Sequence, residues 1–318
     1  MFSGFNLKLD TESIQQAFEL DFNKYKKIGE EHLKSDINRF NSGLKDLINR
    51  KTINGSQLQE YCFPNIEAEI FLSHSHKDRD LANALAGWIN ESFGLKVFVD
   101  SNIWEYSGEL LNELNSKYSN KRPNGRNRFL YDHESCCKAS EHVNTMLSAA
   151  LHKMIDRVEC VILLNTGNSV QVFEDECFDS TYSPWIYSEI MCTQIVRKKP
   201  LLCYREYNEL MHLDESTCFT YDDANLVVSY IMSLKHLVPI DFGVCIKWLY
   251  NYRHNPFEKT YPLDSLYSFT YKNHVEITKK LYHITNPAQI EKIKKYFSEE
   301  LDESLDILKI MQILCGGK

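Results

Sequence analysis

The chain has 318 residues, of which 43% are hydrophobic and 25% are charged, and its formal net charge is −8. This length and composition are typical of a globular protein with a sizeable core, and the negative charge disfavours a nucleic-acid backbone as the main partner. No apolar run approaches the roughly 20 residues of a membrane span. The N-terminal residues show no basic stretch followed by an apolar one, so no secretory signal is expected.

The ten cysteines do not have the spacing of a disulfide framework or a zinc site. Most lie singly in apolar segments, as Cys160 and Cys192 do, where a free thiol behaves as a small hydrophobe. No Cys-x-x-Cys pair occurs. The sequence therefore predicts a reduced, cytoplasmic protein without a structural metal.

The N-terminal residues 1–66 are expected to form a helical segment. Residues 11–50 have apolar positions at three- and four-residue spacing, which favours helices. Residues 51–67 contain Asn-Gly and Pro and are expected to form a connector.

From residue 68 short apolar strands alternate with helical patterns. The helices are expected at 78–94, where Gly94 suits the C-terminal cap, at 140–157 and at 183–199. Alternation of this kind predicts an α/β fold with a parallel sheet covered on both faces, in which ligands bind beyond the carboxyl ends of the strands. The predicted strands are Ile70–Ser73, Lys96–Asp100, Glu159–Asn165 and Pro200–Tyr204.

Two regions depart from this alternation. Residues 107–141 begin as a helix and become polar and turn-rich, which indicates an insertion beside the strand ends. Residues 213–318 are expected to be mainly helical, with Pro287 near one helix start. The chain is thus divided into 1–66, a core domain at 67–212 and 213–318, and the predicted C-terminal helices are 222–237, 244–252, 274–284 and 287–314.

A polar stretch follows the first predicted strand of the core. His74, His76 and Asp78 alternate there, as in the first half of the His-x-His-x-Asp-His signature that metallo-β-lactamase-like hydrolases carry, and such side chains can converge on a divalent ion. Arg79 stands where that signature has its last His, and a fixed cation would repel a metal. The alternative is that Ser75 or Asp78 caps the next helix and the histidines are solvated.

Three segments together resemble the TIR domain over residues 68–207. "IFLSHSHKDRDLANALAGWI" is similar to the opening strand and Ser-His box of that family, and "GLKVFVDSNIW" to its second strand and the mobile loop that follows. "SPWIYSEI" resembles the Ser-x-Trp-x-x-x-Glu segment of enzymatic members. The resemblance is closest to bacterial antiphage proteins of the Thoeris type. It implies a flavodoxin-like TIR domain with helical N- and C-terminal additions.

The resemblance implies cleavage of the nicotinamide–ribose bond of NAD+, to ADP-ribose or a cyclic ADP-ribose-type signal. Glu189 is the candidate catalytic carboxylate, because a carboxylate near the anomeric carbon stabilises an oxocarbenium-like transition state. Trp185 lies four residues earlier and shares its helix face, as pocket wall or as core residue. The alternative is that Glu189 is a solvated acid on the helix surface with no catalytic role. Ser183 and Pro184 suit the cap and first turn of that helix.

The other candidate substrate-binding residues follow two strand ends. Ser73, His74 and Ser75 stand beside a helix start, whose free N–H groups favour the diphosphate oxygens of a nucleotide. Asp100 is placed to accept hydrogen bonds from ribose hydroxyls. Trp104, in the loop that follows, is either a stacking surface for a base or a core residue.

Two rival functions stay open. A non-catalytic TIR module would assemble signalling complexes, and a metal-dependent hydrolase would use His74, His76 and Asp78. On the preferred interpretation NAD+ is the substrate, no cofactor or metal is needed, and no nucleic-acid or membrane partner is expected. Self-association and a downstream effector that senses the product are the expected protein partners.

Overall fold

The sheet at the centre of the molecule is parallel. The computed structural model describes residues 1–9, 22–37, 44–49, 53–63, 66–124, 129–172, 178–199, 202–205, 228–254, 261–267 and 270. Within this part of the chain a five-stranded sheet has the order β10-β1-β6-β2-β3, and every neighbouring pair is parallel. Its strands are β1 (Ser3–Lys8), β2 (Ile70–Ser73), β3 (Val97–Val99), β6 (Cys160–Asn165) and β10 (Val238–Asp241).

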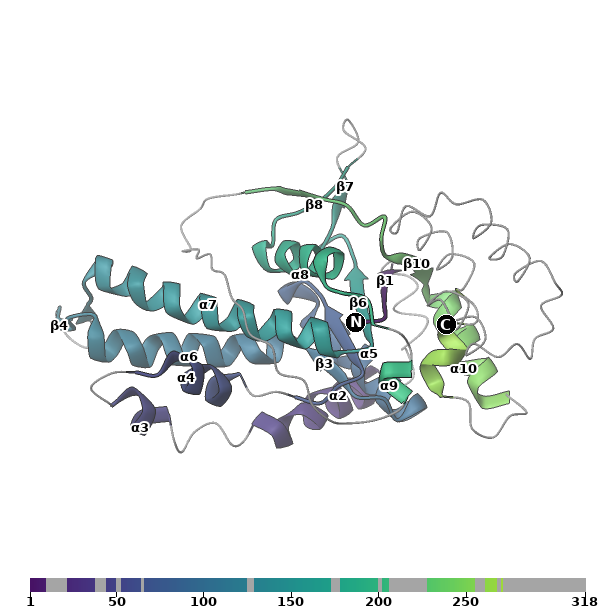
Figure 1. Cartoon of the computed structure of the whole chain (residues 1–318), viewed down its shortest axis with the longest axis horizontal. Coiled ribbons are helices and arrows are strands. Elements are labelled where there is room, and N and C mark those ends of the chain that lie inside the picture. The colour runs from purple at the N-terminus through teal and green to yellow at the C-terminus, as the bar shows by residue number, and fades with distance from the viewer. Residues whose placement is uncertain are drawn as a thin grey trace, which may run out of the picture.

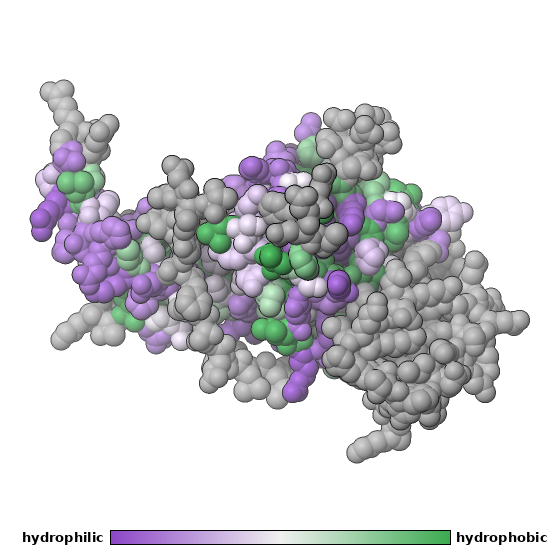
Figure 2. Space-filling model, turned by 90° about the horizontal axis from the view of Figure 1, so that it is seen from above, coloured by the Kyte–Doolittle hydropathy of each residue, from purple (hydrophilic) through white to green (hydrophobic). Residues whose placement is uncertain are grey.

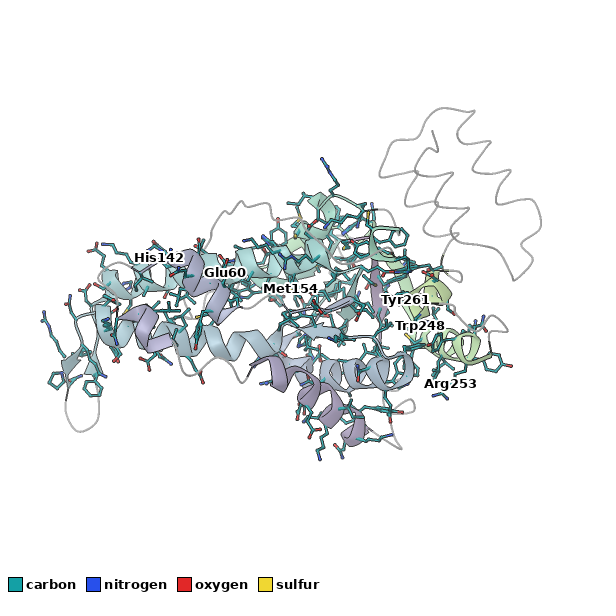
Figure 3. The ribbon with its side chains drawn as sticks, turned by 60° about the horizontal axis from the view of Figure 1, so that its bottom comes forward. Glu60, His142, Met154, Trp248, Arg253 and Tyr261 are labelled. Atoms are coloured by element: carbon teal, nitrogen blue, oxygen red, sulfur yellow. The ribbon has the colours of Figure 1, made fainter. Side chains whose placement is uncertain are left out.

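Helices cover both faces of this sheet. The pair α2 (Phe22–Ile37) and α5 (Arg79–Phe93) lies on one side, and α7 (His133–Arg157) and α8 (Pro184–Ile195) lie on the other (Figures 1 and 3). Residues Ile70–Leu72 of β2 are completely buried, as expected for a strand covered on both faces. The predicted α/β class with a parallel sheet is confirmed.

Several elements lie where the sequence predicts them. The strand Ile70–Ser73 is found unchanged, and β3 and β6 lie inside the predicted ranges. Gly94 ends α5 with a φ of 71°, a left-handed conformation that glycine adopts without a Cβ clash. Ser183 caps α8 by accepting a hydrogen bond from the Ile186 amide, and Pro184 occupies the first turn. The helix predicted at 244–252 is α10 (Phe242–His254).

Three local predictions are wrong. Leu202–Arg205 is a short helix, α9, because β1 occupies the position beside β6 that a further core strand would need. Tyr230–Met232 is strand β9, which pairs with β8 (Asp179–Thr181); its alternation of exposed Ile231 and buried Met232 has the period of a strand. Within the expected connector, α4 (Gly55–Cys62) begins where Asn54 accepts a hydrogen bond from the Gln57 amide.

The sheet takes strands from both flanking segments. Strand β1 comes from the N-terminal segment and lies between β6 and β10, with Phe5 opposite both Ile162 and Val238. Strand β10 comes from the C-terminal segment. A division of the chain at residues 66 and 212 therefore does not separate the sheet from its flanks. The helices expected at 274–284 and 287–314 lie outside the described residues.

The region after β3 forms a helical arm. Helix α6 (Ser101–Tyr118) starts directly at Ser101, so Trp104 lies in a helix and not in the expected loop. A short ladder of β4 (Arg122–Pro123) and β5 (Phe129–Leu130) connects α6 to α7. The two helices run side by side away from the sheet, with α4 against them (Figure 1). In Figure 3 Met154 marks the inner end of α7, and His142 and Glu60 lie along the arm. The expected insertion at 107–141 is the outer half of this arm.

The remaining elements are small. Helix α3 (Leu44–Ile48) contacts the arm, because Lys117 and the Tyr118 hydroxyl both donate to the Ile48 carbonyl. Strand β7 (Gln171–Val172) completes a three-stranded sheet with β8 and β9. Among the described residues, no helix combines the length and the apolar character that crossing a membrane requires.

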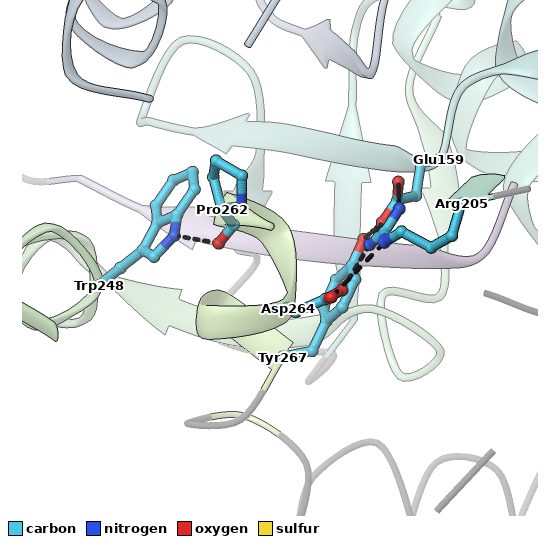
Figure 4. Close-up of polar contacts among 6 residues, drawn as sticks. All are labelled: Glu159, Arg205, Trp248, Pro262, Asp264 and Tyr267. Atoms are coloured by element: carbon cyan, nitrogen blue, oxygen red, sulfur yellow. Dashed lines mark hydrogen bonds and ion pairs between the residues drawn. The ribbon is translucent and has the colours of Figure 1, made fainter. Parts of the chain in front are cut away.

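A network of polar contacts fixes the C-terminal region to the amino end of β6. The Arg205 guanidinium donates to both carboxylate oxygens of Glu159, at 2.6 and 2.8 Å, and to Asp264. The Tyr267 hydroxyl donates to Glu159 at 2.9 Å (Figure 4). Nearby, the Trp248 indole donates to the Pro262 carbonyl at 2.7 Å. Because Glu159 is only 2% exposed, these donors supply the partners that its burial requires.

Helices α2 and α5 approach each other at two glycines. A Cβ at Gly87 would lie 1.9 Å from the Tyr25 carbonyl oxygen, and one at Gly29 would lie 2.0 Å from that of Asn83. Such distances leave no room for a methyl group, so these backbones pack directly against each other.

We expect Gly87→Ala to destabilise the protein, because the added methyl group must push α2 away from α5. The free energy of unfolding should fall by about 1–3 kcal/mol, the usual cost of overpacking. The matched control is Gly108→Ala in α6, where a Cβ meets nothing within 4 Å. That change should stabilise the helix by about 0.5–1 kcal/mol. Chemical denaturation of both variants measures the difference, and equal effects would contradict the close packing.

Candidate functional site

Four predicted site residues meet at the carboxyl edge of the sheet. Ser73 ends β2, His74 follows it, Asp100 follows β3, and Glu189 comes from α8. The Ser73 hydroxyl donates to Glu189 Oε2 at 2.6 Å, and His74 Nδ1 lies 2.7 Å from Asp100 Oδ1. All four residues are less than 5% exposed. Two strand ends and one helix thus supply a single buried polar cluster.

The sheet topology explains why these residues meet. The chain leaves β2 toward β3, whereas it leaves β6 toward the opposite edge, where β10 lies. Connections that diverge in this way open a crevice beyond the carboxyl ends of the two strands. Helix α8 follows β6, and its cap at Ser183 and its proline at 184 fix where it starts. Glu189 then lies one and a half turns into the helix, on a buried position.

The environment of Glu189 favours its neutral, protonated form. Burial raises the pKa of its carboxyl well above the usual value, and the negative charge of Asp100 raises it further. The hydrogen bond from Ser73 favours the charged form but does not outweigh these two effects. Closure of the cluster therefore favours a proton on Glu189.

The surroundings of His74 favour its charged form. Burial alone would lower the pKa of its imidazole, but the charge and hydrogen bond of Asp100 raise that pKa above the usual value. The Leu72 carbonyl, 3.3 Å from Nδ1, acts in the same direction. His74 and Asp100 thus form a buried pair beside Glu189.

Two polar atoms near this pair have no hydrogen-bond partner. Within the described part of the chain, His74 Nε2 and Ser101 Oγ are buried and unpaired. Native proteins rarely leave such groups unsatisfied, because each costs about 1–3 kcal/mol. A polar group that reached these atoms would find hydrogen-bond partners there.

The other candidate residues lie outside the cluster. Ser75 caps the single turn η1 (His76–Asp78) by accepting from the Lys77 amide at 3.4 Å. Asp78 stands at the start of α5 but makes no side-chain cap hydrogen bond, so neither residue caps α5 as expected. Trp185 is half-buried and packs against the main hydrophobic core, which agrees with its core interpretation. The side chain of Trp104 lies outside the described residues. The substrate-binding roles of Ser75, Trp185 and Trp104 stay predictions.

The three residues of the metal interpretation do not converge. His74 faces Asp100, and His76 is exposed. Asp78 is buried and accepts hydrogen bonds from Thr166 and Asn168. In the ranges that the structure describes, no three His, Cys, Asp or Glu side chains are grouped so that they would hold a metal ion. The solvated interpretation of the histidines is right for His76 and wrong for His74.

Sequence reasoning missed the contacts across the crevice. Asp78, after β2, accepts from Thr166 Oγ1 at 2.5 Å and from Asn168 Nδ2 at 2.7 Å, and both of these residues follow β6. The Ser169 hydroxyl donates to the Leu164 carbonyl at 2.7 Å and holds that turn. The signal was present in the run Thr-Gly-Asn-Ser after the predicted strand Glu159–Asn165, because the strand-end rule applies to β6 as it does to β2.

We expect the stability of the protein to fall as the pH rises above about 6.5, the ordinary pKa of histidine. Because the pKa of His74 is raised in the folded state, its contribution is complete below the unfolded pKa and is lost as the pH passes the folded one. His74→Gln should flatten this dependence. Thermal unfolding from weakly acidic to alkaline pH measures it, with exposed His76→Gln as the control. An unchanged slope in His74→Gln would contradict the ion pair.

Comparison of the chain with protein-family models, with curated proteins and with solved structures gave no match.

Proposed function

We propose that this protein is a TIR-type enzyme that cleaves the nicotinamide–ribose bond of NAD+. The product would be ADP-ribose or a cyclic ADP-ribose-type signal, and the process served would be bacterial antiphage defence. The observation that supports this most is the position of Glu189. Its carboxyl is buried at the carboxyl edge of a parallel sheet, hydrogen-bonded by Ser73 and next to Asp100.

The chemistry suits a carboxylate at this position. Nicotinamide leaves as a neutral molecule, and the ribose passes through a transition state with positive charge on the ring. An ionised Glu189 next to the ribose ring stabilises that charge. Asp100 and the imidazole of His74 offer an acceptor and a donor to ribose hydroxyls or phosphate oxygens.

The cluster must open before it can act. Its residues are almost completely buried, and Glu189 keeps its proton while the cluster is closed. Opening the cluster admits water and substrate, and the return of water together with separation from Asp100 lowers the pKa of the Glu189 carboxyl. Access and ionisation are therefore coupled, so the closed form is the inactive one.

The strand order agrees with the TIR proposal in part. Counted from β2, the strands β3-β2-β6 have the order 2-1-3 with which a flavodoxin-like sheet begins. The next position belongs to β1, from the N-terminal segment, and the last to β10. On this proposal the flanking segments complete the sheet of the enzyme.

A non-catalytic TIR module is the second candidate. It is favoured by the burial of Ser73, His74, Asp100 and Glu189, each less than 5% exposed. Hydrogen-bonded polar groups at a closed crevice would then serve only the fold, and the protein would act by association.

Incubation of the full-length protein with NAD+ tests the proposal. Mass spectrometry should detect nicotinamide together with ADP-ribose or its cyclic isomer, at a rate that a chelator leaves unchanged. Loss of the activity on chelation would favour the metal-dependent hydrolase. Absence of products over a range of protein concentrations would favour the non-catalytic module, because assembly is concentration-dependent.

A further inference from the structure

The outer end of the helical arm exposes an apolar surface. Phe129, Leu130 and Tyr131 are 51%, 56% and 40% exposed, and they are consecutive in the chain. The other exposed large hydrophobic side chains of the described residues are not consecutive with one another. Single exposed apolar residues are ordinary, but a contiguous group on a projection marks an interaction site.

The sequence around this surface is rich in basic residues. Residues 117–138 contain six Lys or Arg and two Asp or Glu, so this stretch has a net charge of +4 and the rest of the chain −12. Both acids have local partners: Asp132 accepts hydrogen bonds from the amide and hydroxyl of Ser135, and Glu134 pairs with Lys138. This stretch of the sequence is therefore basic, whereas the rest of the chain is acidic.

One basic side chain lies directly against the apolar surface. The Lys121 ammonium is 4.1 Å from the centre of the Phe129 ring, and Arg122 is exposed on the opposite strand of the ladder, paired with Leu130. Cationic side chains thus lie beside apolar ones at the β4–β5 ladder. In Figure 2 this end of the arm shows hydrophobic residues in green among hydrophilic ones in purple.

The arm separates this basic end from the acidic body. Helix α7 has 25 residues, and at 1.5 Å per residue it is about 37 Å long. Charges more than about 8–10 Å apart are largely screened at physiological salt. Acidic groups of the body near the inner end of α7 therefore repel an anionic surface at the end of the arm only weakly.

We propose that this end of the arm, Lys121–Arg122 together with Phe129–Tyr131, binds the surface of a membrane that contains anionic lipids. The ring of Phe129 and the side chain of Leu130 enter the boundary between head groups and acyl chains, while Lys121 and Arg122 contact lipid phosphates. A small apolar contact combined with basic residues gives reversible membrane attachment, which needs no spanning helix. The proposal is independent of NAD+ cleavage.

Two other partners fit these residues less well. Single-stranded nucleic acid would stack its bases on aromatic faces, but Lys121 already lies over the face of Phe129. A second copy of the chain would need a complementary apolar surface beside its acidic groups. A lipid boundary needs no such complementarity, and it accepts a narrow, projecting tip.

Flotation of the full-length protein with lipid vesicles tests the proposal. The protein should float with vesicles of mixed phosphatidylglycerol and phosphatidylcholine at low salt, and not with phosphatidylcholine alone. Phe129→Ser with Leu130→Ser, and separately Lys121→Glu with Arg122→Glu, should each weaken the binding at least about tenfold. The control replaces Val172 and Ile231, which are exposed on β7 and β9, by Ser. It should bind as the unchanged protein does.

A fluorescence measurement distinguishes insertion from a loss of folding. In Phe129→Trp the tryptophan emission should shift to shorter wavelength when anionic vesicles are added, since the indole leaves water. Absence of flotation with anionic vesicles would overturn the proposal. Flotation that neither double substitution at the end of the arm (the tip variants, Phe129→Ser with Leu130→Ser and Lys121→Glu with Arg122→Glu) reduces would overturn it as well. So would tip variants that instead change the oligomeric state or the binding of a single-stranded oligonucleotide, since the tip would then serve those partners.

Discussion

Glu189→Gln should reduce the cleavage of NAD+ at least about a hundredfold, which is about 2.7 kcal/mol of transition-state stabilisation. The amide keeps the size of the side chain and cannot supply the negative charge that the ribose ring needs. The measurement is turnover of NAD+ by the full-length variant. Glu141→Gln on the exposed face of α7 is the charge-matched control and should keep full activity.

The same substitution should make the protein more stable at neutral pH. Unfolded glutamate loses its proton above a pH of about 4.3, whereas the buried carboxyl of Glu189 keeps it. The folded state therefore binds more protons, and its stability falls as the pH rises through this range. Glutamine has no proton to bind, so the stabilisation by Glu189→Gln should vanish toward a pH of about 4.

Activity and stability together separate the two candidate functions. If Glu189 is catalytic, Glu189→Gln should lose activity and gain stability, because the buried carboxyl lowers the stability of the fold. Near-normal turnover in a folded Glu189→Gln variant would remove Glu189 from the mechanism. A variant that is less stable at neutral pH would show that the carboxyl is a structural group.

Arg205→Met should lower the free energy of unfolding by about 3–5 kcal/mol, the usual cost of leaving a buried partner unpaired. The variant leaves Glu159, which is 2% exposed, with only the Tyr267 hydroxyl among the donors of the network. It also releases Asp264, which ties residues 261–267 to the sheet. Chemical denaturation of the full chain measures the loss.

The loss in Arg205→Met should increase with pH. Burial already raises the pKa of Glu159 above its usual value, although Arg205 and Tyr267 lower it. Without Arg205 that pKa rises further, so the folded state has to hold a proton that the unfolded chain releases. Stability then falls as the pH rises above the ordinary pKa of glutamate.

Two further variants test how much of this loss of stability comes from the buried pair of Glu159 and Arg205. Adding Glu159→Gln to Arg205→Met removes the unpaired acid and should recover part of the lost stability, so that the two changes are not additive. Lys24→Met, which breaks the exposed pair with Glu91, should cost at most about 1 kcal/mol. A loss in Arg205→Met no larger than in Lys24→Met would show that the network does not hold the C-terminal region.

The sequence alone determined the core elements because their signals are local. A strand is specified by the apolar run Ile70–Leu72, and a helix end by the glycine at 94. The start of another helix is specified by the Ser183-Pro184 pair. The rule that ligands bind at the carboxyl ends of parallel strands then brought Ser73, His74 and Asp100 to one edge. The structure places them there with Glu189.

Tertiary structure alone decided which strands complete the sheet. The segment Ser3–Lys8 has no continuous apolar run, and it becomes a strand because β6 and β10 satisfy its backbone on both sides. Leu202–Arg205 has the apolar character of a strand and forms a helix, since that position in the sheet is already filled. Tyr230–Met232 pairs with β8 instead of continuing a helix, and it does so through a contact with a segment about fifty residues earlier.

The sequence alone likewise could not predict the pKa shifts in the cluster. The pKa of Glu189 is raised mainly by complete burial and by the charge of Asp100. Both depend on distances between residues from β3 and α8, which are about ninety residues apart in the chain. Charge interactions and desolvation are set by position in space, and only the folded chain fixes those positions.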